Sequence, residues 1–230
     1  MNVRTTIVFS SLALIYLATL PLTPYVAQFL PKALPIVVLA VFAYTKLSAM
    51  PRYMVLAALL FSLAGDVSLA LPFADSFITG LACFFVAHLT YAMCFALLHR
   101  RLQDTPGDHI ISRKPKWFIS IIMVSFAVMM AVHILPASKA LFYPVVAYIS
   151  VITLMGLTAV WLAQTKLIVT GALFFVISDA ILAQSVFKTP LPLSIIWVTT
   201  TYYGAQYCLT MGLVDGFLRK ENRQEEIGQT

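Results

Sequence analysis

The chain has 230 residues, of which 61% are hydrophobic and only 10% are charged, and its mean hydropathy is +0.92. In soluble domains roughly a quarter of all residues are charged. This composition therefore excludes a soluble globular protein and indicates a polytopic membrane protein. The net charge of +6 comes from basic residues in the predicted loops, where membrane topology explains them, so no nucleic-acid partner is predicted.

Eight apolar segments have lengths near the roughly 20 residues that cross the hydrocarbon core of a bilayer. We therefore predict an all-α fold, a bundle of eight transmembrane helices that forms one domain over residues 1–218. The first segment lacks the small-residue cleavage site of a signal peptide, so we interpret it as part of the bundle. The second is short and could extend back through Lys32. The predicted segments are 5–22, 34–47, 53–71, 77–98, 117–135, 141–163, 167–187 and 193–217.

The connections between these segments predict the orientation of the chain in the membrane. Of the 15 Lys and Arg residues, all but Lys32, Lys139 and Lys188 fall on the side that holds both termini. Basic residues concentrate in cytoplasmic loops, so we expect both termini in the cytoplasm and the protein in a bacterial inner membrane. Only the connection over residues 99–116 is long, and the polar residues 219–230 are expected to form a disordered cytoplasmic tail.

Two acidic residues, Asp66 and Asp179, each lie alone inside a long apolar segment. At 1.5 Å per residue, they lie roughly 20 Å and 18 Å along their helices from the cytoplasmic edge. Carboxylates at such depth are rare and usually face a bundle interior or a wet cavity. Each could instead be a protonated acid that is hydrogen-bonded across the bundle. Two acids at similar depth favour a functional site.

Other polar side chains reach the same depth from two further segments. His88 and Tyr91 are three residues apart and share a helix face, and Tyr202, Tyr203 and Gln206 lie in the last segment. Each group could simply be a satisfied core residue or join neighbouring helices. Their depth, which matches that of the two acids, favours a cavity.

Lys32 is one of the few basic residues on the non-cytoplasmic side. It could anchor the chain to lipid phosphates, or it could hold a lipid phosphate at the mouth of the cavity. The three cysteines, Cys83, Cys94 and Cys208, have neither metal nor disulfide spacing. We predict no metal and no cofactor, because His88 has no second ligand at suitable spacing and no nucleotide-binding or nucleophile motif is present.

Taken together, these residues resemble the YhhN family of membrane proteins over nearly the whole chain. The order and spacing of the motifs and the predicted eight-helix plan fit that family. The motifs that carry the resemblance are Lys32-Ala-Leu-Pro35, Gly65-Asp66, His88-Leu-Thr-Tyr91, Ser178-Asp179 and Tyr202-Tyr203-Gly-Ala-Gln206.

The resemblance implies hydrolysis of the vinyl ether bond of lysoplasmalogens, which releases a fatty aldehyde and glycerophosphoethanolamine or glycerophosphocholine. Such hydrolysis needs an acid that protonates carbon and a negative group that stabilises the resulting cation, as in glycosidases. One of Asp66 and Asp179 would be the acid and the other would stabilise the cation or activate water. The substrate, a lysophospholipid in the bilayer, would be held and oriented by Lys32, His88, Tyr91, Tyr202, Tyr203 and Gln206.

Two other functional classes use buried acids. A proton-coupled transporter or lipid carrier could use them as a proton relay. An intramembrane aspartic protease needs two acids as well, but its usual G-x-G-D signature fails here because position 63 is leucine. Release of aldehyde in detergent, where transport has no meaning, separates the hydrolase from the transporter.

Overall fold

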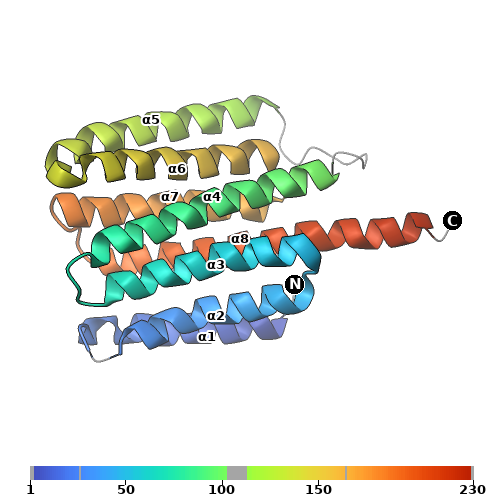
Figure 1. Cartoon of the computed structure of the whole chain (residues 1–230), viewed down its shortest axis with the longest axis horizontal. Helices are drawn as coiled ribbons and strands as arrows, with labels where there is room; N and C mark the ends of the chain where they lie inside the picture. Colours follow the sequence, from blue (N-terminus) through green and yellow to red (C-terminus); the bar gives the residue numbers. More distant parts are fainter. Residues whose placement is uncertain (1–2, 26, 103–112, 164, 229–230) are drawn as a thin grey trace.

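A computed structural model describes residues 3–25, 27–102, 113–163 and 165–228 of the chain (Figure 1). Within these ranges the chain forms α-helices and two short 3-10 helices, and no strand, so the prediction of an all-α fold is confirmed. The helices run side by side along the long axis. The first residues of α1 and the last residues of α8 lie at the same end of the bundle (Figure 1).

The helix boundaries follow the predicted apolar segments, with extensions at several ends. The second helix begins before Lys32, and the long connection before α5 falls mostly outside the described residues. The 3-10 helices η1 (Leu20–Leu22) and η2 (Lys139–Leu141) follow α1 and α5. The α-helices are α1 (Val3–Thr19), α2 (Phe29–Lys46), α3 (Ala49–Ala70), α4 (Ser76–Leu102), α5 (Arg113–Ser138), α6 (Phe142–Leu162), α7 (Lys166–Phe187) and α8 (Ser194–Gly228).

Six stretches of the described chain are long and apolar enough to cross a membrane, which identifies a multi-pass integral membrane protein. One of them, Pro115–Leu162, contains α5, η2 and α6 together. Helix α8 is not among the six, and polar residues such as Thr199, Thr200, Thr201 and Gln206 explain its lower hydropathy. The prediction of eight spans therefore stays a prediction.

The outer helices present apolar side chains to their surroundings, as lipid contact requires. On α5, the side chains of Ile121, Val128 and Val132 are 61%, 57% and 71% exposed. Such a dense apolar exterior would be unstable in water. Helices α5 and α6 form one flank of the bundle, and α1 and α2 lie at the opposite flank (Figure 1).

Helix α8 lies inside the bundle and contacts α1, α2, α3, α4 and α7. It packs most closely on α7, where glycines let the two backbones approach. A Cβ atom on Gly171 of α7 would lie 3.0 Å from the carbonyl oxygen of Ala205, and one on Gly212 would lie 3.0 Å from the amide nitrogen of Ile168. Small residues at helix contacts are typical of membrane bundles. This packing places the polar residues of α8 in the interior.

Helix α8 continues beyond the last predicted apolar segment. Its backbone is helical to Gly228. The prediction of a disordered cytoplasmic tail over residues 219–230 stays a prediction. An ion pair between Asp215 and Arg219, 2.8 Å apart and one helical turn from each other, supports the helix where it leaves the bundle.

Candidate active site

Both acidic residues line one cavity of about 440 Å³ inside the bundle. Asp66 reaches it from α3 and Asp179 from α7. Three other residues that the sequence analysis singled out, Lys32, Tyr202 and Tyr203, also line this cavity. The structure therefore brings together side chains from α2, α3, α7 and α8 at a single internal space, which we call the polar cavity.

Asp66 forms an ion pair across the α2–α3 interface. Its Oδ1 lies 3.0 Å from Nζ of Lys32, and the same ammonium donates a hydrogen bond of 3.3 Å to the backbone carbonyl of Asp66. The side chains are 19% exposed for Lys32 and 5% for Asp66. The hydroxyl of Tyr203 donates to the carbonyl oxygen of Lys32 at 2.8 Å, which ties the first turn of α2 to α8. The acid is thus held by a cation that α8 helps to position.

The glycine before Asp66 makes room for an aromatic ring. A Cβ atom on Gly65 would lie only 2.7 Å from the ring of Phe84 on α4. A glycine beside a buried acid is expected to let another backbone or a substrate come close. In the structure it is the Phe84 side chain that packs against α3 at this point. Phe84 in turn contacts Tyr202 edge to face, with ring centroids 5.9 Å apart, and both residues line the polar cavity.

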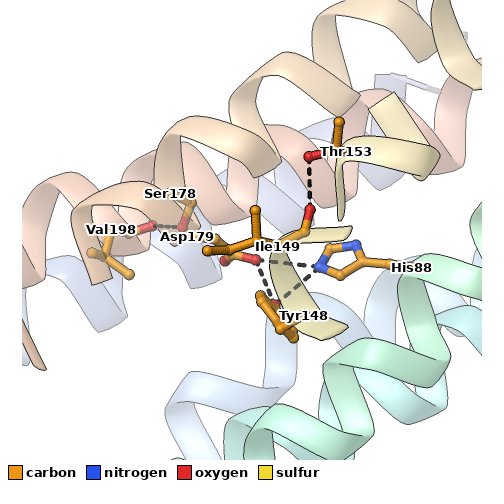
Figure 2. Close-up of polar contacts among 7 residues, drawn as sticks. All are labelled: His88, Tyr148, Ile149, Thr153, Ser178, Asp179 and Val198. Carbon is orange, nitrogen blue, oxygen red and sulfur yellow. Dashed lines mark hydrogen bonds and ion pairs between the residues drawn. The ribbon is translucent and has the colours of Figure 1, made fainter. Parts of the chain in front are cut away.

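Asp179 is held differently, by hydrogen bonds from two other helices (Figure 2). Its Oδ2 accepts a hydrogen bond of 2.5 Å from the hydroxyl of Tyr148 on α6 and lies 3.2 Å from Nε2 of His88 on α4. The hydroxyl of Tyr148 and Nε2 of His88 are also 3.0 Å apart. Figure 2 shows the three side chains pointing toward one another, whereas Ser178 points to the carbonyl oxygen of Val198, to which it donates at 3.1 Å.

Tyr148 was missed by the sequence analysis. It follows Phe142 and Tyr143 in the sequence, and aromatic residues near the end of a membrane helix are typical of the interface. Only its depth, roughly 9 Å from the start of α6, distinguishes it from an interfacial residue. Tyr16 of α1, which also lines the polar cavity, was missed because α1 carries no acid that draws attention to it.

Tyr91 and Gln206 lie apart from the polar cavity. The hydroxyl of Tyr91 donates to Oε1 of Gln206 at 2.6 Å, both side chains are fully buried, and neither lines the polar cavity. Their hydrogen bond joins α4 to α8. His88 is fully buried too and meets the cavity only through Asp179.

The arrangement gives two carboxyl groups unlike surroundings at one internal space. Asp66 faces a cation, whereas among the described residues the only basic side chain within ion-pair distance of Asp179 is His88. Oδ2 of Asp66 is buried and has no hydrogen-bonding partner among the described residues. Pairs of carboxyl groups in different environments can divide the roles of proton donor and anionic stabiliser between them.

Comparisons with known proteins connect this site to a family. The model of the YhhN family matches residues 27–213, which include every residue of the polar cavity except Tyr16. Human lysoplasmalogenase TMEM86B is 35% identical over 185 residues, which cover 79% of this chain and 73% of that protein. Human lysoplasmalogenase TMEM86A is 28% identical (68% and 63%), and pig lysoplasmalogenase TMEM86B is 31% identical (68% and 61%). No solved structure matches the chain significantly.

Proposed function

The chain belongs to the YhhN family, and from that premise we propose that it hydrolyses the vinyl ether bond of lysoplasmalogens. The products are a fatty aldehyde and glycerophosphoethanolamine or glycerophosphocholine. The similarity to proteins named lysoplasmalogenase supports the reaction. The observation that carries its assignment to this site is the polar cavity, whose wall holds two aspartates in unlike surroundings and a lysine that pairs with Asp66.

Asp179 is the proton donor in this proposal. Lys32 balances the charge of Asp66, so Asp66 is the carboxylate that stabilises a cation. Tyr148 and His88 both contact Oδ2 of Asp179, which leaves Oδ1 to carry the transferred proton. His88 contacts this carboxyl group from α4 and, with Tyr148, fixes its orientation.

The steps follow from the chemistry of a vinyl ether. Asp179 protonates the alkenyl carbon that does not bear oxygen, the double-bond electrons form the new C–H bond, and an oxocarbenium ion remains. The Asp66 carboxylate stabilises this cation. Water adds to the oxygen-bearing carbon and returns a proton to the Asp179 carboxylate. The resulting hemiacetal breaks its C–O bond to the glycerol, which leaves as the alcohol, and the aldehyde forms.

Lys32 has a further role at the headgroup. A lysine ammonium has three donors, and two of them are directed at Oδ1 and the carbonyl oxygen of Asp66. The third remains for the substrate phosphate. Tyr202 and Tyr203 line the same cavity and bound the space for the glycerol backbone.

Purified protein in detergent, incubated with lysoplasmalogen or with the matching ordinary lysophospholipid, tests the function. We expect aldehyde from the first and no fatty acid from the second. Cleavage of the acyl ester without cleavage of the vinyl ether would contradict the proposal. Because detergent abolishes compartments, aldehyde formation there also separates the hydrolase from a transporter or lipid carrier.

We also propose that all eight helices cross the bacterial inner membrane with both termini in the cytoplasm. The distribution of Lys and Arg supports this orientation, and so does the common end of the bundle at which α1 begins and α8 ends (Figure 1). Fusions of a fluorescent protein and of alkaline phosphatase to each terminus test it. We expect fluorescence and no phosphatase activity at both termini; phosphatase activity at either would contradict the topology.

A further inference from the structure

A second cavity lies on the other side of Asp179, between α4, α5, α6 and α7. Its walls are almost entirely hydrocarbon, with residues such as Met123, Ala127, Met130 and Ile152. Thr153 and the pair formed by Tyr148 and Asp179 supply its polar groups. We call this space the apolar cavity.

The polar and apolar cavities share part of their walls. Five residues line both spaces: Leu69, Phe77, Phe84, Asp179 and Leu182. Asp179 is the one ionisable residue among these five. A molecule that extends from one space into the other therefore passes this carboxyl group.

The junction lies where α4 faces α7. Helix α4 packs mainly on α3, α6 and α8, and α7 packs mainly on α8, α6 and α5. Long side chains span the separation between them: Phe77 contacts Phe187 with ring centroids 5.7 Å apart, and His88 reaches Asp179. Side chains can move aside for a ligand more readily than close-packed backbones can.

We propose that the apolar cavity binds the alkenyl chain of the lysolipid, while the polar cavity binds its phosphate and glycerol. This inference rests on the proposed function and adds the binding mode. The substrate has one polar and one hydrocarbon part joined at the vinyl ether. Of the two spaces that share Asp179, one holds the lysine, Asp66 and several hydroxyl groups beside its apolar wall, and the other is lined almost entirely by hydrocarbon. The match places the reacting carbons beside the proposed acid.

The same arrangement predicts which residues determine chain selectivity. Ala127 and Met130 on α5 line the apolar cavity and not the polar one. A large side chain at position 127 would occupy the space of the hydrocarbon, and a small one at position 130 would widen it. Neither change alters the residues at the junction.

The test compares long-chain (hexadecenyl) with short-chain (butenyl) vinyl ether lysolipids, using purified Ala127→Phe. We expect kcat/KM to fall about tenfold or more for the long chain and to stay near that of the wild type for the short chain. Val124→Phe is the matched control, because Val124 lies one turn earlier on α5, is 43% exposed and lines neither cavity. It should leave both rates unchanged.

Met130→Ala tests the proposal in the opposite direction and does not depend on how well Ala127→Phe folds. We expect it to raise the relative kcat/KM for substrates whose chain ends in a bulky ring. The inference is overturned if neither variant changes the preference for chain length or shape. It is also overturned if Ala127→Phe lowers kcat/KM equally for long and short chains while Met130→Ala gives no gain for the bulky chain. Wild-type cleavage of the long-chain substrate in the same assay shows whether the proposed function itself holds.

Discussion

Asp66 and Asp179 lie at similar depth in the bundle, yet the structure stabilises them by different means. Asp66 faces an ammonium group 3.0 Å away, and Asp179 accepts a hydrogen bond from a tyrosine and contacts a histidine. Asp66 thus lies beside an ammonium group, which only donates hydrogen bonds, whereas Asp179 lies beside a hydroxyl and an imidazole, which can each donate or accept one. The difference shows how one fold can place two carboxyl groups in unlike surroundings on the wall of one cavity.

The largest expected effect is on catalysis. Asp179→Asn and Asp66→Asn should each reduce aldehyde release by about 10²–10⁴-fold, because the proposed mechanism uses Asp179 as the general acid and the negative charge of Asp66 to stabilise the cation. Asp215→Asn is a matched control, since Asp215 lies outside both cavities and pairs only with Arg219 among the described residues. Full activity in either of the first two variants, purified as folded protein, would remove the aspartate pair from the mechanism.

Stability should separate the two acids. Asp66→Asn leaves Lys32 without its counter-ion, so we expect the free energy of unfolding to fall by up to about 3 kcal/mol. Asp179→Asn keeps its hydrogen-bonding neighbours and should change it much less. Thermal unfolding in detergent measures both.

The double variant Lys32→Met/Asp66→Asn provides the control for this comparison. It removes both charges, so it should recover much of the stability that Asp66→Asn loses. The contradicting result would be an equal loss of unfolding free energy in Asp66→Asn and Asp179→Asn, with no recovery in the double variant. The ion pair with Lys32 would then not distinguish the surroundings of Asp66 from those of Asp179.

A smaller effect is expected at Tyr148. Tyr148→Phe removes the hydrogen bond of 2.5 Å to Asp179, and we expect kcat to fall by about tenfold with little change in stability. Tyr143→Phe on the same helix is the control, because the side chain of Tyr143 is 81% exposed. Wild-type kcat in Tyr148→Phe would show that His88 alone positions the acid.

The smallest effect should come from the buried pair outside the cavities. Tyr91→Phe removes the hydrogen bond to Gln206, and we expect a loss of about 1 kcal/mol in stability with activity within about twofold of the wild type. The sequence suggested that both residues orient the substrate. A loss of activity as large as that of Tyr148→Phe would support that earlier assignment.

The predictable parts of the molecule are those that hydropathy encodes directly. Apolar segments reveal the helices, and an acid inside an apolar segment stands out because its burial is costly, so Asp66 and Asp179 could be found from the sequence. Lys32 stands out for another reason, because it is one of only three basic residues on the predicted non-cytoplasmic side.

Hydropathy says less about residues that are themselves amphipathic. Tyr148 and Tyr16 resemble interfacial tyrosines until the packing of α6 and α1 shows what they contact. The apolar cavity is invisible in the sequence, because Met130 or Ala127 has the same hydropathy whether it faces a cavity or lipid. Which cation neutralises Asp66 depends on the approach of α2 to α3, and a sequence pattern does not encode such tertiary geometry.

Hydrolysis by wild-type protein in deuterium oxide, with the aldehyde reduced at once to the alcohol, tests the central claim most directly. Asp179 exchanges its proton with solvent, so the account predicts one deuterium on the carbon next to the former aldehyde carbon, detected by mass spectrometry. Aldehyde incubated without enzyme corrects for exchange after release. A product that carries no deuterium at that carbon would contradict proton delivery to the vinyl ether by an acid in this cavity.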